Sequence, residues 1–291
     1  MIKGIILKGI AGFYYVKTDD NLFECKARGK FKNRKMIPLV GDRVLILPEN
    51  DKKATIEEIE DRTTQLLRPA VANVDQSVIV FSIQNPDPNI ILLDKMTVLS
   101  LSSGVEPVIC FNKLDEDLNG SAALLKTAYE TAGFKVILSS AETGEGIQEL
   151  KDLIKDKITV FAGPSGVGKS SLLNKLQKGL VLKTGEISVK IKRGKHTTRH
   201  SELIEMEQGG WVVDTPGFTS LELDFLEADT LKEFFPDFEG HEDLCRFDDC
   251  IHINEPKCGV MAAVETNKIT KKRYDSYRYL YLEIKNGRRQ F

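Results

Sequence analysis

The chain opens with short apolar stretches that alternate with polar and turn residues, up to about residue 65. The stretches are rich in branched and aromatic side chains and lie at Ile5–Leu7, Phe13–Val16, Asn21–Cys25 and Arg43–Leu47. Glycines and an Asp-Asp-Asn turn separate them, which is the pattern of a small antiparallel barrel or sandwich. A five-stranded OB-type barrel fits this length, although the spacing does not distinguish it from an SH3-like barrel.

From about residue 73 the pattern changes to alternating strands and helices. Buried strands are predicted at Gln76–Ser82, Pro107–Phe111, Lys135–Leu138, Ile158–Ala162 and Trp211–Val213. Helices are predicted at Ile90–Leu101, Ser121–Ala132 and Ile147–Ile154, and from Lys169 to about Gln177. Such alternation is typical of a largely parallel sheet with helices on both faces. The stretch 183–202 has no clear period and is expected to be a loop, and helical patterns return after Phe218.

These changes of pattern predict a multidomain α/β protein. We expect a β-barrel over residues 1–68, a central domain over residues 69–222 and a helical C-terminal domain over residues 223–291. Hydrophobic and charged contents of 41% and 29% are ordinary for a globular protein. The longest apolar runs are too short to span a bilayer, and the N-terminus lacks the apolar core of a secretory signal. We therefore expect a cytoplasmic protein without membrane contact.

The segment Gly-Pro-Ser-Gly-Val-Gly-Lys-Ser fits the phosphate-loop pattern G-x-x-x-x-G-K-S. It follows a predicted strand and opens a predicted helix, which is the context that the motif requires. Backbone N–H groups of such a loop wrap a β-phosphate, while Lys169 would reach the β- and γ-phosphates and Ser170 would bind Mg²⁺. The expected phosphate-binding residues are Gly163, Pro164, Ser165, Gly166, Val167, Gly168, Lys169, Ser170 and Ser171.

A second motif indicates which base the site reads. The run Asn112, Lys113, Leu114, Asp115 stands at the carboxyl end of a predicted strand, where ligands bind in such sheets. A carboxylate on Asp115 can accept hydrogen bonds from guanine N1–H and N2–H₂, whereas adenine offers no such pair of donors. Ser139, Ser140 and Ala141 follow the next predicted strand and complete the guanine-binding set.

The third motif, Asp-Thr-Pro-Gly at residues 214–217, follows a further strand. Asp214 would hold Mg²⁺ through water, and the Gly217 N–H would sense the γ-phosphate. Upstream lies His196, followed by Thr197 and Thr198; one of the two threonines is expected to bind Mg²⁺, and the sequence does not say which.

Many GTPases place a water-orienting Gln just after the glycine of this last motif, and here that position is Phe218. Hydrolysis by the isolated protein is therefore expected to be slow. His196 is the candidate replacement, against the alternative of a solvated loop histidine. The expected catalytic residues are His196, Lys169, Thr197 and Thr198.

Near the C-terminus, Cys245, Cys250, His252 and Cys258 are spaced Cys-x4-Cys-x-His-x5-Cys. Three thiolates and one imidazole make a tetrahedral Zn²⁺ set with no open ligand position, so one structural ion is expected. Buried, unconnected thiols are the alternative. Cys25 and Cys110 lie in strand-like runs and are expected to be core residues.

The net charge is −2, so any contact with nucleic acid must come from local patches. One basic stretch comprises Lys26, Arg28, Lys30, Lys32, Arg34 and Lys35, with Phe31 among them. A second interleaves Lys271, Lys272, Arg273 and Arg278 with Tyr274, Tyr277, Tyr279 and Tyr281. Cations with aromatic rings suit phosphate contacts and base stacking, and a solvated face is the alternative for each stretch.

The guanine-reading motif precedes the phosphate loop, so the GTPase domain is circularly permuted. With this order, the phosphate loop, the His-Thr-Thr segment, Asp-Thr-Pro-Gly-Phe and the Cys₃His spacing, the chain resembles the ribosome small-subunit-dependent GTPase A family (RsgA, also called YjeQ or YloQ). The resemblance covers essentially the whole length. It implies an OB-fold barrel, a central permuted GTPase and a C-terminal zinc domain.

The resemblance further implies a GTP hydrolase that acts late in assembly of the small (30S) ribosomal subunit. The subunit would activate the enzyme, and hydrolysis would control its release. GTP or GDP, Mg²⁺ and one Zn²⁺ are the implied cofactors, and the subunit with its rRNA is the implied partner, together with other assembly factors. We expect a monomer. Two alternatives stay open: an RNA-binding scaffold that uses GTP without turnover, and a P-loop kinase or ATPase, which the guanine-reading motif opposes.

Overall fold

The computed structural model describes residues 1–29, 31, 36–67, 69–177, 201–214 and 222–287. The chain divides into two compact units. The first comprises Met1–Ser77, Ile147–Ala162 and Lys169–Thr219, and the second comprises Val78–Gly146, Gly163–Gly168 and Ser220–Phe291. The predicted domain limits at residues 68 and 222 stay predictions.

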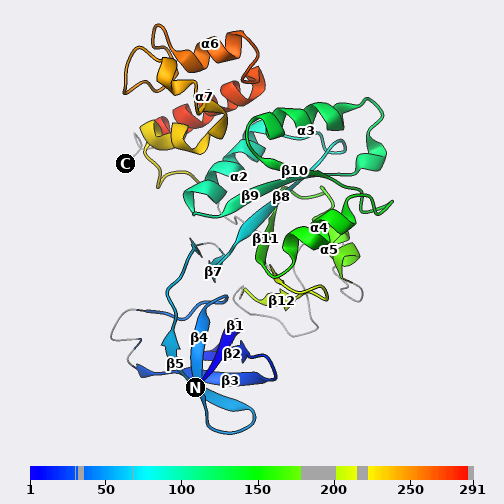
Figure 1. The fold of residues 1–291 in the computed structure, drawn as a ribbon, viewed down its shortest axis with the longest axis vertical. Helices are drawn as coiled ribbons and strands as arrows, with labels where there is room; N and C mark the ends of the chain where they lie inside the picture. Colours follow the sequence, from blue (N-terminus) through cyan, green and yellow to red (C-terminus); the bar gives the residue numbers. More distant parts are fainter. Residues whose placement is uncertain (30, 32–35, 68, 178–200, 215–221, 288–291) are drawn as a thin grey trace. The chain divides into compact units, whose positions relative to one another are not determined.

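The N-terminal strands close into a barrel in the order β1-β2-β3-β5-β4 (Figure 1). The strands are β1 (Ile2–Ile10), β2 (Phe13–Lys17), β3 (Leu22–Ala27), β4 (Arg43–Pro48) and β5 (Lys53–Ile59). β3 and β5 run parallel, whereas the other pairs are antiparallel, and this is the connection order of an OB barrel. The topology thus decides between the two barrels that the sequence left open.

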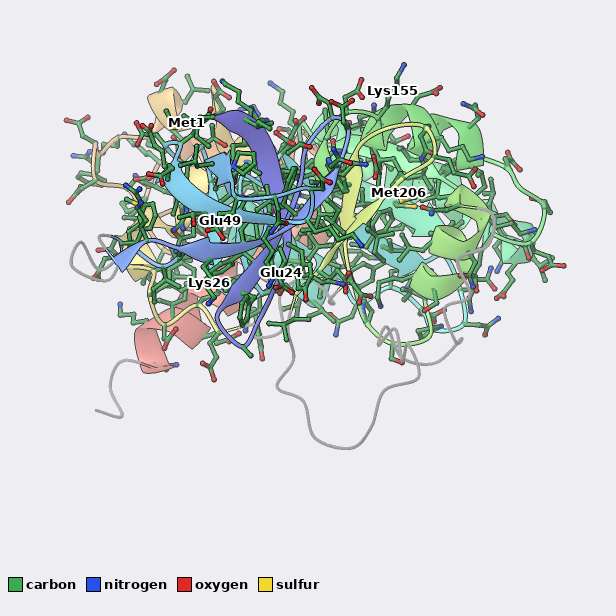
Figure 2. All side chains as sticks on the ribbon, turned by 90° about the horizontal axis from the view of Figure 1, so that it is seen from below. Met1, Glu24, Lys26, Glu49, Lys155 and Met206 are labelled. Carbon is green, nitrogen blue, oxygen red and sulfur yellow. The ribbon has the colours of Figure 1, made fainter. Side chains whose placement is uncertain are left out.

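Alternation of side chains along the strands fills the barrel core. Cys25 is fully buried, as predicted, while its neighbours Glu24 and Lys26 lie on the outer side of β3 (Figure 2). Lys26 lies over the ring of Phe13, 5.2 Å from its centroid. Phe31, in contrast, is buried in the core, so its predicted place beside the basic residues as a stacking surface is wrong.

A six-stranded sheet follows, with the order β10-β9-β8-β11-β13-β12. Its strands are β8 (Gln76–Ser82), β9 (Glu106–Asn112), β10 (Lys135–Leu138), β11 (Ile158–Ala162), β12 (Leu203–Glu205) and β13 (Trp211–Val213). The pairs β10–β9 and β11–β13 are parallel, and only the edge strand β12 is antiparallel among the pairings described. The mostly parallel sheet predicted from the sequence is confirmed. The short strands β12, β6 (Gln65–Leu67) and β7 (Ala70–Ala72) were not predicted.

The helices between these strands also match the prediction closely. They are α2 (Ile90–Ser102), α3 (Ser121–Thr131), α4 (Ile147–Ile154) and α5 (Lys169–Leu176). Asn89 begins α2 by accepting the Leu92 N–H, and Asp117 accepts the N–H groups of Ser121 and Ala122 at the start of α3. Within the described residues, no helix is both long and apolar enough to cross a membrane.

The C-terminal region consists of 3₁₀ turns and two helices. The turns are η2 (Ala228–Phe234), η3 (Pro236–Phe238) and η4 (Glu242–Leu244), and the helices are α6 (Gly259–Glu265) and α7 (Lys271–Gly287). Arg273 of α7 is 1% exposed and donates to Asp94 of α2 and to Asp237. Its guanidinium also lies about 5 Å from the rings of Tyr129, Phe134 and Phe235. This paired, buried cation ties α7 to α2 and to η3.

The rings of α7 are mostly core residues rather than a stacking surface. Tyr274, Tyr277 and Tyr281 are 7%, 0% and 3% exposed, and only Tyr279 is open to solvent among the four tyrosines of the helix. The hydroxyls of Tyr274 and Tyr277 donate to the carbonyls of His252 and Ile251. The interpretation of this helix as a cation-and-aromatic nucleic-acid surface is therefore wrong for Arg273 and these three tyrosines.

Candidate functional site

The predicted guanine-reading residues converge where strands β9 and β10 end. Asn112 is the last residue of β9, Lys113 adopts a left-handed conformation with φ of 63°, and Asp115 lies in the 3₁₀ turn that follows. Asp115 is exposed, and its Oδ1 accepts a hydrogen bond from the Ser140 hydroxyl. The carboxylate is therefore held at one oxygen while the other can accept hydrogen bonds from a ligand.

Asn112 joins the guanine motif to two other predicted segments. Its side chain is buried; Nδ2 donates to the Val167 carbonyl at 2.8 Å, and Oδ1 accepts from the Ala141 N–H at 3.2 Å and from Ser139 Oγ at 3.3 Å. Ser139 Oγ also lies 3.2 Å from the Sγ of Cys110, which is buried as predicted. One amide thus fixes the phosphate loop and the Ser-Ser-Ala loop to the end of β9.

The phosphate loop needs its glycines for two separate reasons. Gly163, Gly166 and Gly168 all have positive φ, a conformation that side chains disfavour. A Cβ added to Gly168 would also lie 2.2 Å from Asn112 Nδ2. Glycine at this position therefore permits the hydrogen bond from Asn112 to the neighbouring Val167 carbonyl.

A neighbouring contact was missed from the sequence. Lys113 Nζ donates to the Asn85 carbonyl, and Asn85 Nδ2 donates to Glu116 Oε2 at 2.8 Å. Glu116 Oε1 lies 3.7 Å from Lys113 Nζ, so the three residues form a cluster beside Asp115. Asn85 follows the carboxyl end of β8. Because ligand-facing loops lie at such ends, this position was the one sequence feature that could have identified Asn85 as part of the site.

In the first unit, Lys169 and Ser170 form the first turn of α5, and each is 8% exposed. Burial lowers the pKa of Lys169 to about 8. A largely buried ammonium group at a helix N-terminus is stabilised when a phosphate anion binds beside it. This is the position and chemistry that the phosphate-loop motif predicts for these two residues.

Asp214 stands directly after β13 in the same unit. Its Oδ1 is buried, and no described residue forms a hydrogen bond with it. Burial, and secondarily the charge of Glu202, raise the pKa of Asp214 to about 7. A buried carboxylate oxygen without a partner fits a hydrated Mg²⁺ ion, because Mg²⁺ keeps most of its waters and uses carboxylate ligands. His196, Thr197, Thr198, Gly217, Phe218 and the predicted loop around them lie outside the described residues.

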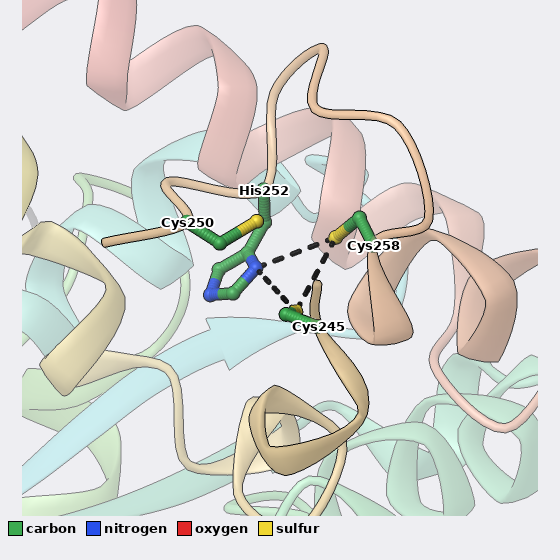
Figure 3. A group of neighbouring side chains, drawn as sticks. All are labelled: Cys245, Cys250, His252 and Cys258. Atoms are coloured by element: carbon green, nitrogen blue, oxygen red, sulfur yellow. Dashed lines mark hydrogen bonds between the residues drawn. The ribbon is translucent and has the colours of Figure 1, made fainter. Parts of the chain in front are cut away.

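The four predicted zinc ligands come together near the start of α6 (Figure 3). The ligand atoms of Cys245, Cys250, His252 and Cys258 all lie within 4.8 Å of one another. His252 Nδ1 faces the sulfurs, at 3.6 Å from Cys245 and 3.4 Å from Cys258. This donor set and spacing fit one tetrahedral Zn²⁺ ion.

Outer contacts orient these ligands. The other ring nitrogen of His252 lies 3.1 Å from Glu242 Oε1, a carboxylate contact that fixes the imidazole for metal binding. The Gly259 N–H donates to Cys245 Sγ at 3.2 Å, and the Met261 N–H donates to Cys258 Sγ at 3.4 Å. Burial raises the pKa of Cys250 to about 12, so a cation is needed to keep that sulfur ionised.

Comparison with known proteins agrees with this geometry. A model of the RsgA GTPase family matches residues 59–224, and a model of the RsgA N-terminal domain matches residues 3–56. A protein of Alkaliphilus metalliredigens named small ribosomal subunit biogenesis GTPase RsgA is 49% identical over 99% of this chain and 100% of its own length. The chain belongs to the RsgA GTPase family. A protein of the same name from Clostridium novyi is 48% identical, with 99% of each chain covered.

Solved structures of RsgA relatives share the whole fold. YjeQ from Thermotoga maritima has a TM-score of 0.87 at 36% identity and matches over 97% of this chain and 98% of its own. A structure described as YloQ, a circularly permuted GTPase, has a TM-score of 0.84 at 37% identity, with 98% and 96% covered. The permuted GTPase fold, the barrel and the family resemblance are therefore confirmed. RsgA-family GTPases hydrolyse GTP and use Mg²⁺.

Proposed function

We propose that this protein hydrolyses GTP during late assembly of the small (30S) ribosomal subunit, and that the subunit activates it. The observation that carries the proposal is the cluster around Asn112, in which one buried amide holds the guanine motif and the phosphate loop together. The names of the RsgA relatives supply the assembly context. Hydrolysis would then control release from the subunit, and the site of action would be the cytoplasm.

We assign the residue roles by their chemistry. Asp115 reads the guanine N1–H and N2–H₂, and Ser140 keeps its carboxylate oriented. Lys169 binds the β- and γ-phosphates, and Asp214 and Ser170 hold Mg²⁺, which neutralises charge on the phosphates. His196 orients the attacking water in place of the Gln that Phe218 replaces, and Thr197 or Thr198 adds a ligand to Mg²⁺.

The barrel and the exposed basic side chains are assigned to rRNA. Lys26 is exposed on β3 and contacts only the Phe13 ring in the interactions described, whereas Arg28 lies 2.8 Å from Glu57, so Lys26 is the better candidate for a phosphate contact. The protein is proposed to act as a monomer, and further partners would be other assembly factors of the same subunit.

The deciding experiment is GTP hydrolysis by the purified protein with and without small ribosomal subunits. Strong stimulation that disappears in Lys169→Ala supports a subunit-activated GTPase. His196→Ala is expected to keep GTP affinity and lose the stimulated turnover. Tight GTP binding without stimulation would instead support the RNA-binding scaffold. Efficient competition by ATP for the bound GTP would contradict the guanine assignment of Asp115.

A further inference from the structure

An ion pair connects the barrel to Glu202, the residue just before β12. Lys8 of β1 lies 3.1 Å from the Oε1 of Glu202, with side chains that are 31% and 34% exposed. The backbones of the same two residues form an antiparallel bridge, so their approach is set by the chain as well as by charge. The Lys8 ammonium also lies 5.1 Å from the centroid of the Tyr15 ring, which restricts its direction.

Glu202 in turn contacts Asp214 through the backbone. The Asp214 N–H donates to the Glu202 carbonyl at 2.8 Å, and the adjacent residues Leu203 and Val213 are paired in the β12–β13 ladder. The Glu202 charge acts on the Asp214 carboxylate, whose Oδ1 has no partner among the described residues. Glu202 therefore influences both the position and the electrostatic surroundings of Asp214.

We propose that Glu202 is a positioning residue for Asp214, and that Lys8 sets how strongly Glu202 acts on the Mg²⁺-dependent binding of GTP. The proposal rests on the assignment of Asp214 to Mg²⁺ made above. Glu202 adds negative potential where the cation binds, and the Lys8 ammonium offsets part of it. A change at Lys8, on the barrel, thus alters cation affinity in the GTPase domain without a direct contact to Asp214.

The expected effects have opposite signs. Glu202→Gln removes the negative charge and raises the Mg²⁺ concentration for half-maximal binding of a non-hydrolysable GTP analogue by about two- to fivefold, the scale of a partly exposed charge pair. Lys8→Ala leaves the negative charge of Glu202 without its positive partner. The Mg²⁺ concentration for half-maximal binding is then lowered by a similar factor. In the double variant the Lys8 change has no further effect, because Lys8 acts only through Glu202.

A matched control exists three residues further along, at the end of β12. Lys17 of β2 lies 4.0 Å from Glu205 Oε2 in β12, so this pair also joins the barrel to β12. Lys17→Ala and Glu205→Gln are expected to leave the Mg²⁺ dependence unchanged. GDP binding without Mg²⁺ and the thermal midpoint, measured for all variants, separate a cation effect from a loss of folding.

Three results would overturn the proposal. The first is an unchanged Mg²⁺ dependence in Glu202→Gln and Lys8→Ala. The second is a Lys8→Ala shift of the same size with and without Glu202→Gln, and the third is a shift of the same size in the Lys17 and Glu205 variants. Asp214→Asn separates this failure from that of the proposed function. If Asp214→Asn leaves the Mg²⁺ dependence intact, the assignment of Asp214 itself is wrong. If it abolishes the dependence while the Glu202 variants behave as wild type, only the role of Glu202 fails.

Discussion

The residues around Asn112 in the second unit and Asp214 in the first unit differ in how far their polar atoms are satisfied by the protein itself. Asn112 uses both ends of its amide on protein partners, and Asp115 has one oxygen held by Ser140. Asp214, by contrast, keeps a buried oxygen without a partner among the described residues and a pKa raised to about 7 by burial and by Glu202. If the proposed roles hold, the base-reading residues are organised in advance, whereas the cation-binding residue is completed by its ligand.

This difference separates residues that are stabilised by their own hydrogen bonds from residues that lower the stability of the free protein. A network whose members satisfy one another rigidifies the loops that carry the guanine motif. A buried carboxylate without a partner costs folding free energy, and such cost is common at functional sites. The zinc cluster resembles Asp214 in this respect, because its four donors converge on a place that a cation has to fill.

Metal removal is expected to have the largest effect. Structural Zn²⁺ in small domains contributes about 10–16 kcal/mol of apparent binding free energy at neutral pH, so chelation or Cys258→Ser should unfold the region around α6. Circular dichroism and limited proteolysis would show the loss. His241→Ala is the control, because His241 is close by and is not among the four converging ligands. An unchanged melting profile after complete zinc removal would contradict a structural ion.

Asp115→Ala is expected to have the next largest effect, on nucleotide affinity. Without the carboxylate, guanine N1–H and N2–H₂ have no acceptor, and GDP affinity should fall by about 10²-fold or more. Titration with a fluorescent GDP analogue measures the change. Glu116→Gln, one residue away, should change affinity far less. If GDP binds Asp115→Ala as it binds the wild type, a different residue reads the base.

Asn112→Ala tests the organisation of the guanine cluster directly. It removes the hydrogen-bond partner of the half-buried Ala141 N–H and of the buried Val167 carbonyl, and the buried carbonyl alone costs about 1–3 kcal/mol. Both thermal stability and GDP affinity should therefore fall. Ser139→Ala is the milder control, because it removes one hydrogen bond to the same amide. A loss of affinity with full stability would show that Asn112 contacts the ligand rather than the loops.

Asp214→Asn is expected to have the smallest effect on the free protein, and a stabilising one. The pKa of Asp214 is raised from 3.8 to about 7, so the folded chain binds the proton more tightly than the unfolded chain. Wild-type stability should therefore fall as the pH rises from about 4 to about 7 and stay lower above that. The Asn variant lacks this decline, so denaturant titrations without Mg²⁺ should diverge above pH 7 and converge near pH 4. Parallel pH profiles would show that the carboxylate is solvated.

Much of this arrangement could be predicted from the sequence, because loops at the carboxyl ends of parallel strands must meet. Asn112, Ser139 and Gly168 were found as motif residues on that ground. Glu116 and Glu202 were not, since each forms its contact with a residue distant in sequence, Asn85 and Lys8 respectively.

Local pattern also failed where burial depends on tertiary packing. Tyr274 and Tyr277 have polar tips and cationic neighbours in the sequence, yet their hydroxyls donate to backbone carbonyls and their rings fill the core. Strand β12 has three residues, too few for a periodic signal to show.

The same short strand β12 ends the six-stranded sheet, and Glu202, the residue just before it, forms the bridge to Lys8 of the barrel strand β1. An uncovered sheet edge invites pairing with another molecule and hence aggregation. At this bridge the barrel therefore covers one end of the edge. A chain cut just before Gln65 would expose the edge of β12, and its GTPase domain would tend to self-associate in solution even with every nucleotide-binding residue in place.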